Sequence, residues 1–278
     1  MIDQYCVFGN PIAQSKSPDI HRQFARQTGE NLDYQKQLVE VDGFNDAATA
    51  FFNGGGLGLN ITAPFKLDAY NFADQLTERA KNAGAVNTLK KSENGTILGD
   101  NTDGQGMVSD ISENLGWPLR DQRVLILGAG GAVRGVLQPL LEKHPKQLVI
   151  ANRTLSKAQI LADEFLIYGK IDVCEFDQLA GRRFDLVING TSAGLSGNLP
   201  PLPDGFVDAE SYCYDMTYGA TPTVFMQWAK QQGVNSIADG LGMLVGQAAE
   251  SFRLWRGVFP QVTPVIHNQR LLLSKAAG

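Results

Sequence analysis

The sequence predicts an α/β protein made of two domains, and three observations lead to this prediction. Short apolar runs alternate with helix-like segments along most of the 278 residues, a pattern typical of sheets with right-handed crossover connections. A glycine-rich turn directly follows an unbroken apolar run at residues 123–127, and Gly116-Trp117-Pro118 separates that run from the first half. A chain of this length, 43% hydrophobic, can bury one or two cores.

The composition excludes several classes of protein. The net charge is −5 and no long basic run exists, which argues against a nucleic-acid partner. No apolar run approaches the roughly 18 residues of a membrane span, and the first residues do not resemble a signal peptide. Cys6, Cys174 and Cys213 fit neither a disulfide framework nor a metal site. We expect a cytoplasmic monomer or homodimer without a bound metal.

Strands and helices of the first half are marked by apolar runs and by proline and glycine. Ser17 is the expected N-cap of the first helix because Pro18 suits a first helical turn. Gly54-Gly55-Gly56 is expected to end the second helix, and Pro64 fits the start of another. Asn94-Gly95 is a strong hairpin signal. Strands are predicted at 5–9, 34–39, 57–61, 86–90 and 96–99, and helices at 18–28 and 44–53.

The second half alternates strand and helix more regularly. Strands are predicted at 123–127, 148–151, 185–189, 212–216 and 236–238, and helices at 104–115 and 244–259. The run at 123–127 is apolar throughout, which is typical of a strand buried on both faces of a parallel sheet. We expect the helix at 244–259 to pack back on the first half. The predicted domains are therefore residues 1–103 with 240–278, and residues 104–239.

The glycine-rich turn predicts a nucleotide site. Gly128-Ala129-Gly130-Gly131-Ala132 follows a strand and opens a helix, the order found in Rossmann-type dinucleotide-binding domains. The glycines let the backbone approach a pyrophosphate, and the helix N-terminus supplies N–H groups. Val133 replaces the third glycine of the fingerprint, from which we expect slightly wider packing of helix on strand. The second domain is thus predicted to be a doubly wound Rossmann domain.

The end of the next strand indicates which dinucleotide binds. An NAD enzyme usually has Asp or Glu there to bind the ribose 2′-OH, but this chain has Ala151-Asn152-Arg153-Thr154. Arg153 offers a planar fork for a 2′-phosphate, and Lys157 adds a second cation. NADP is favoured over NAD, although two cations at a helix start can also simply face solvent.

A hydride-transferring enzyme also needs a group that gives or takes the hydroxyl proton. The three histidines, His21, His144 and His267, lack the spacing of a zinc site. Polar residues instead cluster where predicted strands end, and ligands of open α/β domains sit beyond the carboxyl ends of strands. These polar residues are Thr62, Lys66, Asn87 and Asp103.

Motifs in a fixed order along nearly the whole chain resemble the shikimate dehydrogenase family. They are Ser15-Lys16-Ser17-Pro18, Asn60-Ile61-Thr62-Ala63-Pro64-Phe65-Lys66, Gly84-Ala85-Val86-Asn87-Thr88, Gly99-Asp100-Asn101-Thr102-Asp103-Gly104, Gly128-Ala129-Gly130-Gly131-Ala132, Asn152-Arg153-Thr154, Asp215-Met216-Thr217-Tyr218 and Asp239-Gly240-Leu241-Gly242-Met243-Leu244-Val245-Gly246-Gln247. The resemblance implies an N-terminal mixed α/β substrate domain and a Rossmann-type NADP domain. It further implies reversible reduction of 3-dehydroshikimate to shikimate, in chorismate and aromatic amino acid biosynthesis.

The resemblance also implies a role for each matched residue. Lys66 and Asp103 would be the catalytic pair, with Lys66 transferring the proton. The residues implied to hold the substrate are Ser15, Ser17, Thr62, Lys66, Asn87, Asp103, Tyr218 and Gln247. The residues implied to hold or flank the cofactor are Glu78, Gly128, Ala129, Gly130, Gly131, Ala132, Asn152, Arg153, Thr154, Lys157, Met216, Gly240 and Met243. Thr191-Ser192-Ala193 is also placed near the cofactor.

Alternatives remain at the level of single residues and of function. Taken alone, Lys66 could be a solvated helix lysine and Asp103 a helix N-cap. The sequence leaves open whether Lys66 gives or takes the proton, because a neighbouring carboxylate and burial act in opposite directions. The functional alternatives are a quinate/shikimate dehydrogenase that uses NAD(P), and an NADP-binding sensor without catalysis.

Overall fold

A computed structural model describes residues 2–193 and 197–277 of the chain. The chain folds into two compact units: unit 1 is Met1–Gly106 with Val245–Ile266, and unit 2 is Met107–Leu244 with His267–Gly278. Unit 1 therefore takes in a C-terminal segment, Val245–Ile266. The predicted domain ends at residue 278, whereas the segment from His267 onward groups with unit 2.

Unit 1 contains a six-stranded mixed sheet with strand order β2-β1-β3-β5-β6-β4. Its strands are β1 (Asp3–Gly9), β2 (Leu32–Leu38), β3 (Gly56–Ile61), β4 (Gln75–Leu76), β5 (Thr88–Lys91) and β6 (Ile97–Asp100). Strand β1 is parallel to β2 and β3, and β5 is antiparallel to β3 and β6. The β5–β6 hairpin turns where predicted, with Gly95 at φ 87°.

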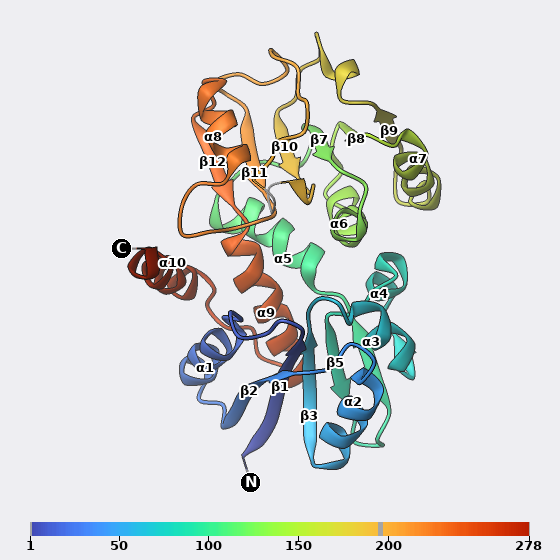
Figure 1. Cartoon of the computed structure of the whole chain (residues 1–278), viewed down its shortest axis with the longest axis vertical. Helices are drawn as coiled ribbons and strands as arrows, with labels where there is room; N and C mark the ends of the chain where they lie inside the picture. The colour runs from blue at the N-terminus through green and yellow to red at the C-terminus, as the bar shows by residue number, and fades with distance from the viewer. Residues whose placement is uncertain (1, 194–196, 278) are drawn as a thin grey trace. The chain divides into compact units, whose positions relative to one another are not determined.

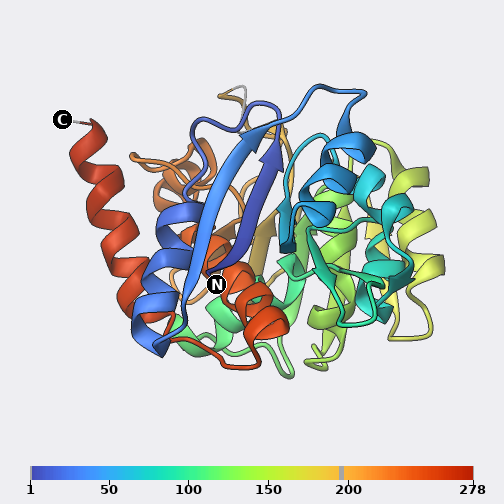
Figure 2. The same ribbon diagram turned by 90° about the horizontal axis from the view of Figure 1, so that it is seen from below.

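Helices cover both faces of this sheet because the side chains of β1 alternate between two cores. Tyr5 and Val7 pack with Trp255 of α9, whereas Cys6 and Phe8 pack with α2 and α3 on the opposite face. Helix α1 lies on the same side as α9 (Figures 1 and 2). The helices are α1 (Ser17–Thr28), α2 (Phe44–Asn53), α3 (Lys66–Phe72), α4 (Glu78–Ala83) and α9 (Leu241–Arg256), of which unit 1 contains the part from Val245 onward.

The predicted cap of α1 is wrong by one residue. Lys16, not Ser17, is the N-cap, and it makes no side-chain capping bond. Ser17 is instead the first helical residue, and its N–H donates to the Ser15 hydroxyl at 3.4 Å. The serine that supports the helix start is therefore the one two residues earlier, since a free N–H in the first turn needs an acceptor from outside the helix.

Unit 2 contains a six-stranded sheet in which every pairing is parallel, with order β12-β11-β10-β7-β8-β9. The order reverses between β7 and β10, as in doubly wound dinucleotide-binding domains. The predicted fold class is confirmed. The strands are β7 (Arg123–Leu127), β8 (Gln147–Ala151), β9 (Ile171–Cys174), β10 (Leu186–Asn189), β11 (Tyr212–Asp215) and β12 (Ser236–Asp239).

The unbroken apolar run of β7 follows from burial on both faces. Val124 and Ile126 belong to the core beneath α6, and Leu125 and Leu127 belong to the core beneath α8. All four side chains are fully buried. The remaining elements are α5 (Asp103–Ser109), a π-helical turn (Asp110–Asn114), α6 (Gly131–Leu141), α7 (Leu155–Glu164), a 3₁₀ turn (Asp177–Leu179), α8 (Val224–Gln231) and α10 (Thr263–Ala277).

Several elements of the two units were not predicted, among them strand β9 and helix α10. Strand β9 is an edge strand interrupted by the polar Asp172, so its apolar run is too short to stand out. Helix α10 buries Val265, Gln269 and Leu273, and the polar residue among them weakens the helical pattern. No helix within the described residues is long and apolar enough to cross a membrane.

Candidate active site and cofactor pocket

Lys66 and Asp103 are brought together at one edge of the unit 1 sheet. Each is the first residue of a helix, α3 after β3 and α5 after β6. Because β5 is antiparallel to both strands, β3 and β6 point the same way and their carboxyl ends share an edge. The Lys66 Nζ lies 2.5 Å from Asp103 Oδ2, and the two side chains are 36% and 20% exposed. The pair is thus fixed by an ion pair yet open to a ligand.

Asn87 binds the other oxygen of the same carboxylate. Its Nδ2 donates to Asp103 Oδ1 at 2.9 Å and lies 3.3 Å from Gln247 Oε1. Its Oδ1 accepts from the backbone N–H of Thr102 at 3.0 Å. A backbone N–H can only donate, so the amide orientation is defined. Four of the residues named by the resemblance, Lys66, Asn87, Asp103 and Gln247, therefore form one connected polar cluster.

Two glycines hold Gln247 close to this cluster. A Cβ on Gly106 of α5 would lie 2.4 Å from the Gln247 backbone nitrogen, and one on Gly246 would lie 2.9 Å from the Gly106 carbonyl oxygen. Side chains are never accommodated at such distances from backbone atoms. The two helices touch through backbone here, which fixes the point from which the Gln247 side chain extends.

A buried ion pair supports the turn that leads into Asp103. Asp100, at the end of β6, accepts from Arg79 Nε at 2.7 Å and from Arg79 Nη2 at 2.5 Å. Burial alone would raise the pKa of Asp100, but Arg79, the Thr77 hydroxyl and the Asn101 N–H outweigh it and lower the pKa. Asp100 is therefore an ionised, buried anchor three residues before Asp103.

The other predicted substrate residues lie in both units. Ser15 is in the loop before α1 and Ser17 begins that helix, where it is buried. Thr62 follows β3, and its backbone N–H donates to the Phe8 carbonyl at 3.0 Å. Tyr218 is in unit 2, in the loop after β11, and is 36% exposed. Burial raises the pKa of Tyr218, helped by the nearby Asp239 carboxylate, so its hydroxyl keeps its proton.

Unit 2 has a pocket of about 640 Å³ at the point where its strand order reverses. The turn after β7 and the turn after β10 meet there: Gly128 has φ 102°, and a Cβ on it would lie 3.2 Å from the Gly190 carbonyl oxygen. Gly130 and Gly131 face open space, and α6 begins at Gly131. This glycine cradle at a helix N-terminus fits the pyrophosphate of a dinucleotide.

Val133, which replaces the third glycine, packs against the neighbouring strand turn. A Cβ on Gly190 would lie 2.5 Å from Val133 Cγ2, and Val133 is fully buried. Gly190, which lacks a side chain, therefore leaves the room that the Val133 side chain occupies. The sequence analysis did not single out Gly190.

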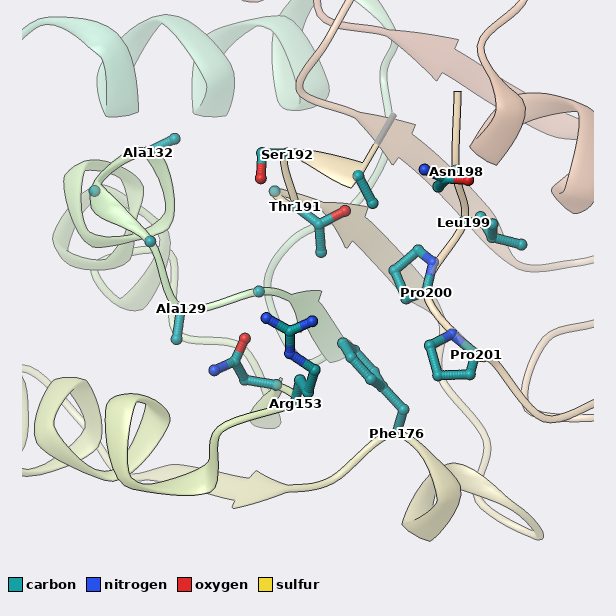
Figure 3. A pocket seen from close by; sticks show the side chains of 16 residues that line it. Ala129, Ala132, Arg153, Phe176, Thr191, Ser192, Asn198, Leu199, Pro200 and Pro201 are labelled. Atoms are coloured by element: carbon teal, nitrogen blue, oxygen red, sulfur yellow. The ribbon is translucent and has the colours of Figure 1, made fainter. Parts of the chain in front are cut away.

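The residues after β8 divide into two groups. Asn152 and Arg153 line the pocket, and Figure 3 shows the Arg153 guanidinium and the Phe176 ring pointing into it. Thr154 is the N-cap of α7 without a side-chain capping bond, and Lys157 lies in the first turn of that helix. Both are exposed, and neither is among the lining residues. No carboxylate occurs between Ala151 and Lys157, so the charge here suits a 2′-phosphate.

The remaining predicted cofactor residues are spread over both units. The Met216 sulfur lies 3.1 Å from where a Gly190 Cβ would be, and a Cβ on Gly240 would lie 2.3 Å from the Met216 carbonyl oxygen. Met243 packs against the core beneath α6. Glu78 begins α4 of unit 1.

Sequence reasoning missed several residues of both sites. Phe176, Asn198, Leu199, Pro200 and Pro201 line the pocket together with Thr191, Ser192 and Ala193. The Pro200-Pro201 dipeptide was the one sequence feature that could have drawn attention to this pocket-lining loop. Around Asn87 it missed the buried polar residues Asn60, Thr88, Thr102 and Ser251. Among the residues that the structure describes, no group of three or more His, Cys, Asp or Glu side chains could hold a metal ion.

Three family models match the chain. The shikimate dehydrogenase substrate binding domain matches residues 7–89, the shikimate / quinate 5-dehydrogenase model matches residues 110–196, and the shikimate 5′-dehydrogenase C-terminal domain matches residues 240–266. Together they account for more than half of the chain. The chain belongs to the shikimate dehydrogenase family.

Similar members of the shikimate dehydrogenase family come from several bacteria. The chain is 63% identical over 266 residues to shikimate dehydrogenase (NADP(+)) of Cellvibrio japonicus, covering 96% of each chain. It is 56% identical over 274 residues to the Photobacterium profundum protein of the same name, covering 99% of this chain and all of that one. The shikimate 5-dehydrogenase of Thermus thermophilus, solved in complex with NADP(H) and shikimate, has a TM-score of 0.85 at 30% identity. That match covers 96% of this chain and 98% of the other.

Proposed function

We propose that this protein is an NADP-dependent shikimate dehydrogenase that reversibly reduces 3-dehydroshikimate to shikimate. The observation that carries the proposal is the Lys66–Asp103 pair, 2.5 Å apart, with Asn87 on the second carboxylate oxygen. It occurs in a chain 63% identical to a protein named shikimate dehydrogenase (NADP(+)).

The reaction needs a proton donor or acceptor at the substrate oxygen that changes between hydroxyl and carbonyl. Lys66 is the group for this role, because its Nζ is held by Asp103 and is still 36% exposed. Asp103 fixes the amine and offsets its charge. Asn87 and Gln247 present amide groups beside the pair, and amide groups suit the hydroxyls of a polyol ring.

The hydride comes from or goes to NADP when that dinucleotide is bound. The glycine turn and the first N–H groups of α6 would hold its pyrophosphate, and Arg153 would hold the 2′-phosphate with a bidentate contact. Thr154 and Lys157 would add a hydroxyl and a second cation at the same helix start. Met216, Gly240 and Met243 would flank the nicotinamide.

The test follows absorbance at the NADPH band with shikimate and NADP⁺ as reactants. Wild type should turn over, and Lys66→Ala should lose about 10²–10⁴-fold in kcat, the range of general acid–base catalysis, while still binding NADP. Lys81→Ala, which removes an exposed lysine of the same unit, is the matched control and should keep wild-type turnover. Full activity of Lys66→Ala would refute the proposed role of the pair.

The same assay separates the functional alternatives. Equal rates with NAD, or comparable rates with quinate, would replace the proposal by a quinate/shikimate dehydrogenase that uses NAD(P). Tight NADP binding by a wild-type protein without turnover would indicate a sensor.

We further propose a cytoplasmic location and a monomer or homodimer. The cysteines Cys6, Cys174 and Cys213 are free and buried, as is typical of proteins in a reducing compartment. Cell fractionation and the mass of the protein in solution would test the two proposals separately.

A further inference from the structure

Beneath the Lys66–Asp103 pair lies a set of buried polar side chains. Asn87 is 2% exposed, Asn60 is 5% exposed, and Thr88, Thr102 and Ser251 are fully buried. They come from β3, from the start of β5, from the turn before α5 and from α9. Buried polar groups on this scale are tolerated when they are hydrogen-bonded to one another, and here they are.

The orientation of the Asn87 amide in this cluster follows from a backbone N–H that can only donate. The Thr102 backbone N–H donates to Asn87 Oδ1 at 3.0 Å, so that atom is an acceptor. Thr88 Oγ1 lies 2.8 Å from the same oxygen, so the Thr88 hydroxyl must donate to it. Thr88 Oγ1 also lies 2.7 Å from Ser251 Oγ, whose single proton is shared between Thr88 Oγ1 and the Gln247 backbone carbonyl, 3.0 Å away.

The same reasoning extends the chain to its far end. Asn60 Nδ2 lies 3.2 Å from the Asn87 carbonyl oxygen and 3.0 Å from Ser251 Oγ, so it donates. Tyr34 donates its hydroxyl to Asn60 Oδ1 at 2.8 Å. Burial raises the pKa of Tyr34 well above its usual value, so this donor keeps its proton.

Hydrogen bonds therefore connect Tyr34, Asn60, Ser251, Thr88 and Asn87 to Asp103 Oδ1. Hydrogen bonds connected in a network polarise one another. As a result, Asn87 directs its NH₂ group, and not its oxygen, toward the Asp103 carboxylate that holds Lys66.

We propose that Thr88 and Ser251 are positioning residues, which act through Asn87 to orient the catalytic Asp103. The proposal rests on the proposed function for its kinetic readout. Without the Thr88 hydroxyl, Asn87 Oδ1 keeps only its two contacts with Thr102, at 3.0 and 3.2 Å. The Thr102 hydroxyl also lies 2.9 Å from Asn87 Nδ2. Because a hydroxyl can donate or accept, it pairs with either end of the amide and does not favour one orientation. The preference for NH₂ toward Asp103 is then reduced.

The experiment compares Thr88→Val, which keeps the shape and removes the hydroxyl, with Thr88→Ser, which keeps the hydroxyl and removes a methyl. For Thr88→Val we expect kcat with shikimate and NADP⁺ to fall about tenfold, a barrier increase of about 1.4 kcal/mol, while KM for shikimate changes less than about threefold. For Thr88→Ser we expect kcat within about twofold of wild type. Ser251→Ala should resemble Thr88→Val.

A control separates this effect from the loss of any buried hydroxyl. Ser211→Ala removes a buried hydroxyl of unit 2 that donates to the Phe184 carbonyl, and its kcat should equal that of wild type. A Thr88→Val protein with wild-type kcat would overturn the proposal. So would a Thr88→Ser protein as slow as Thr88→Val, since shape and not the hydroxyl would then be responsible.

A second measurement does not depend on activity. In the ligand-free protein, the NMR signals of the Asn87 side-chain amide report its orientation, and exchange of these protons with solvent should rise at least tenfold in Thr88→Val and not in Thr88→Ser. Unchanged exchange in Thr88→Val would refute the proposal even if the variant were inactive. If wild type did not oxidise shikimate, the proposed function would fail, and this measurement would still decide the role of Thr88.

Discussion

Removal of Arg79 should lower the stability of unit 1 without touching the Lys66–Asp103 pair directly. It is bonded to Asp100, which is 1% exposed, and lies 3.6 Å from Glu250, which is 6% exposed. Arg79→Met would leave two buried carboxylates without their shared cation. Breaking a buried pair by removing one partner typically costs about 3–5 kcal/mol.

For Arg79→Met we expect a loss at the lower end of the range of about 3–5 kcal/mol, because both carboxylates keep other partners. Glu250 keeps a contact with Arg253 at 2.7 Å, and Asp100 keeps the Thr77 hydroxyl at 2.6 Å and the Asn101 N–H at 2.8 Å. We therefore expect Arg79→Met to lower the free energy of unfolding by about 3 kcal/mol at pH 7.

The loss should depend on pH with a defined sign. In wild type the pKa of Asp100 is lowered, so its contribution to stability is complete above about pH 3.9, the unfolded value, and disappears as pH falls through the folded pKa. In Arg79→Met, burial prevails and Asp100 takes up a proton at higher pH. The difference between wild type and variant should therefore be largest at pH 7 and should shrink toward pH 4.5.

Urea unfolding followed by circular dichroism at both pH values measures this difference. Arg183→Met, which breaks an ion pair whose side chains are 51% and 49% exposed, is the control and should change stability by less than about 1 kcal/mol. An Arg79→Met protein within about 1 kcal/mol of wild type at pH 7 would refute the reasoning, as would a difference that is the same at both pH values.

Two further predictions concern the cofactor and a buried histidine. Arg153→Ser should lower kcat/KM for NADP about 10–100-fold and leave kcat/KM for NAD unchanged, because a bidentate charged contact to a phosphate is worth about 1.5–3 kcal/mol; equal losses with both cofactors would contradict this. Burial lowers the pKa of His21 to about 3, only partly offset by the Asn60 amide, and neither ring nitrogen meets hydrogen-bond geometry with the described residues. Between pH 6.5 and 5 the unfolded histidine takes up a proton that the folded one does not, so wild type should lose about 2 kcal/mol of stability that His21→Phe retains. Urea unfolding at the two pH values measures this, and equal slopes for wild type and His21→Phe would exclude it.

The sequence predicted most of the framework because local signals and burial agree there. The strand at 123–127 was predicted at its observed bounds, since β7 is buried on both faces and an apolar run records that directly. Helix α2 was likewise predicted at its observed bounds, because Gly54 follows its last turn. Residues at strand ends, such as Lys66 and Asp103, were named together because ligands of such folds collect at that edge.

What the sequence did not reveal depends on contacts between distant segments. Ser251 is a buried polar residue next to buried Glu250 in α9, and nothing local shows that it meets Thr88, 163 positions away. Phe176 lines the nucleotide pocket but lies just before a 3₁₀ turn that carries no motif. The N-cap of α1 was misplaced because the Ser15 hydroxyl supports the helix start from outside it.

The contact between Val133 and Gly190 has a consequence for how this family varies. Because the Val133 side chain occupies the place that a Cβ on Gly190 would take, the two positions are expected to vary in size together across relatives. Glycine at 133 would remove the closest obstacle to alanine at 190 and leave the Met216 sulfur at 3.1 Å, whereas Gly190→Ala in the present chain would place a methyl 2.5 Å from Val133 Cγ2. Engineering of nucleotide preference in this chain should therefore leave both positions alone, or change them as a pair.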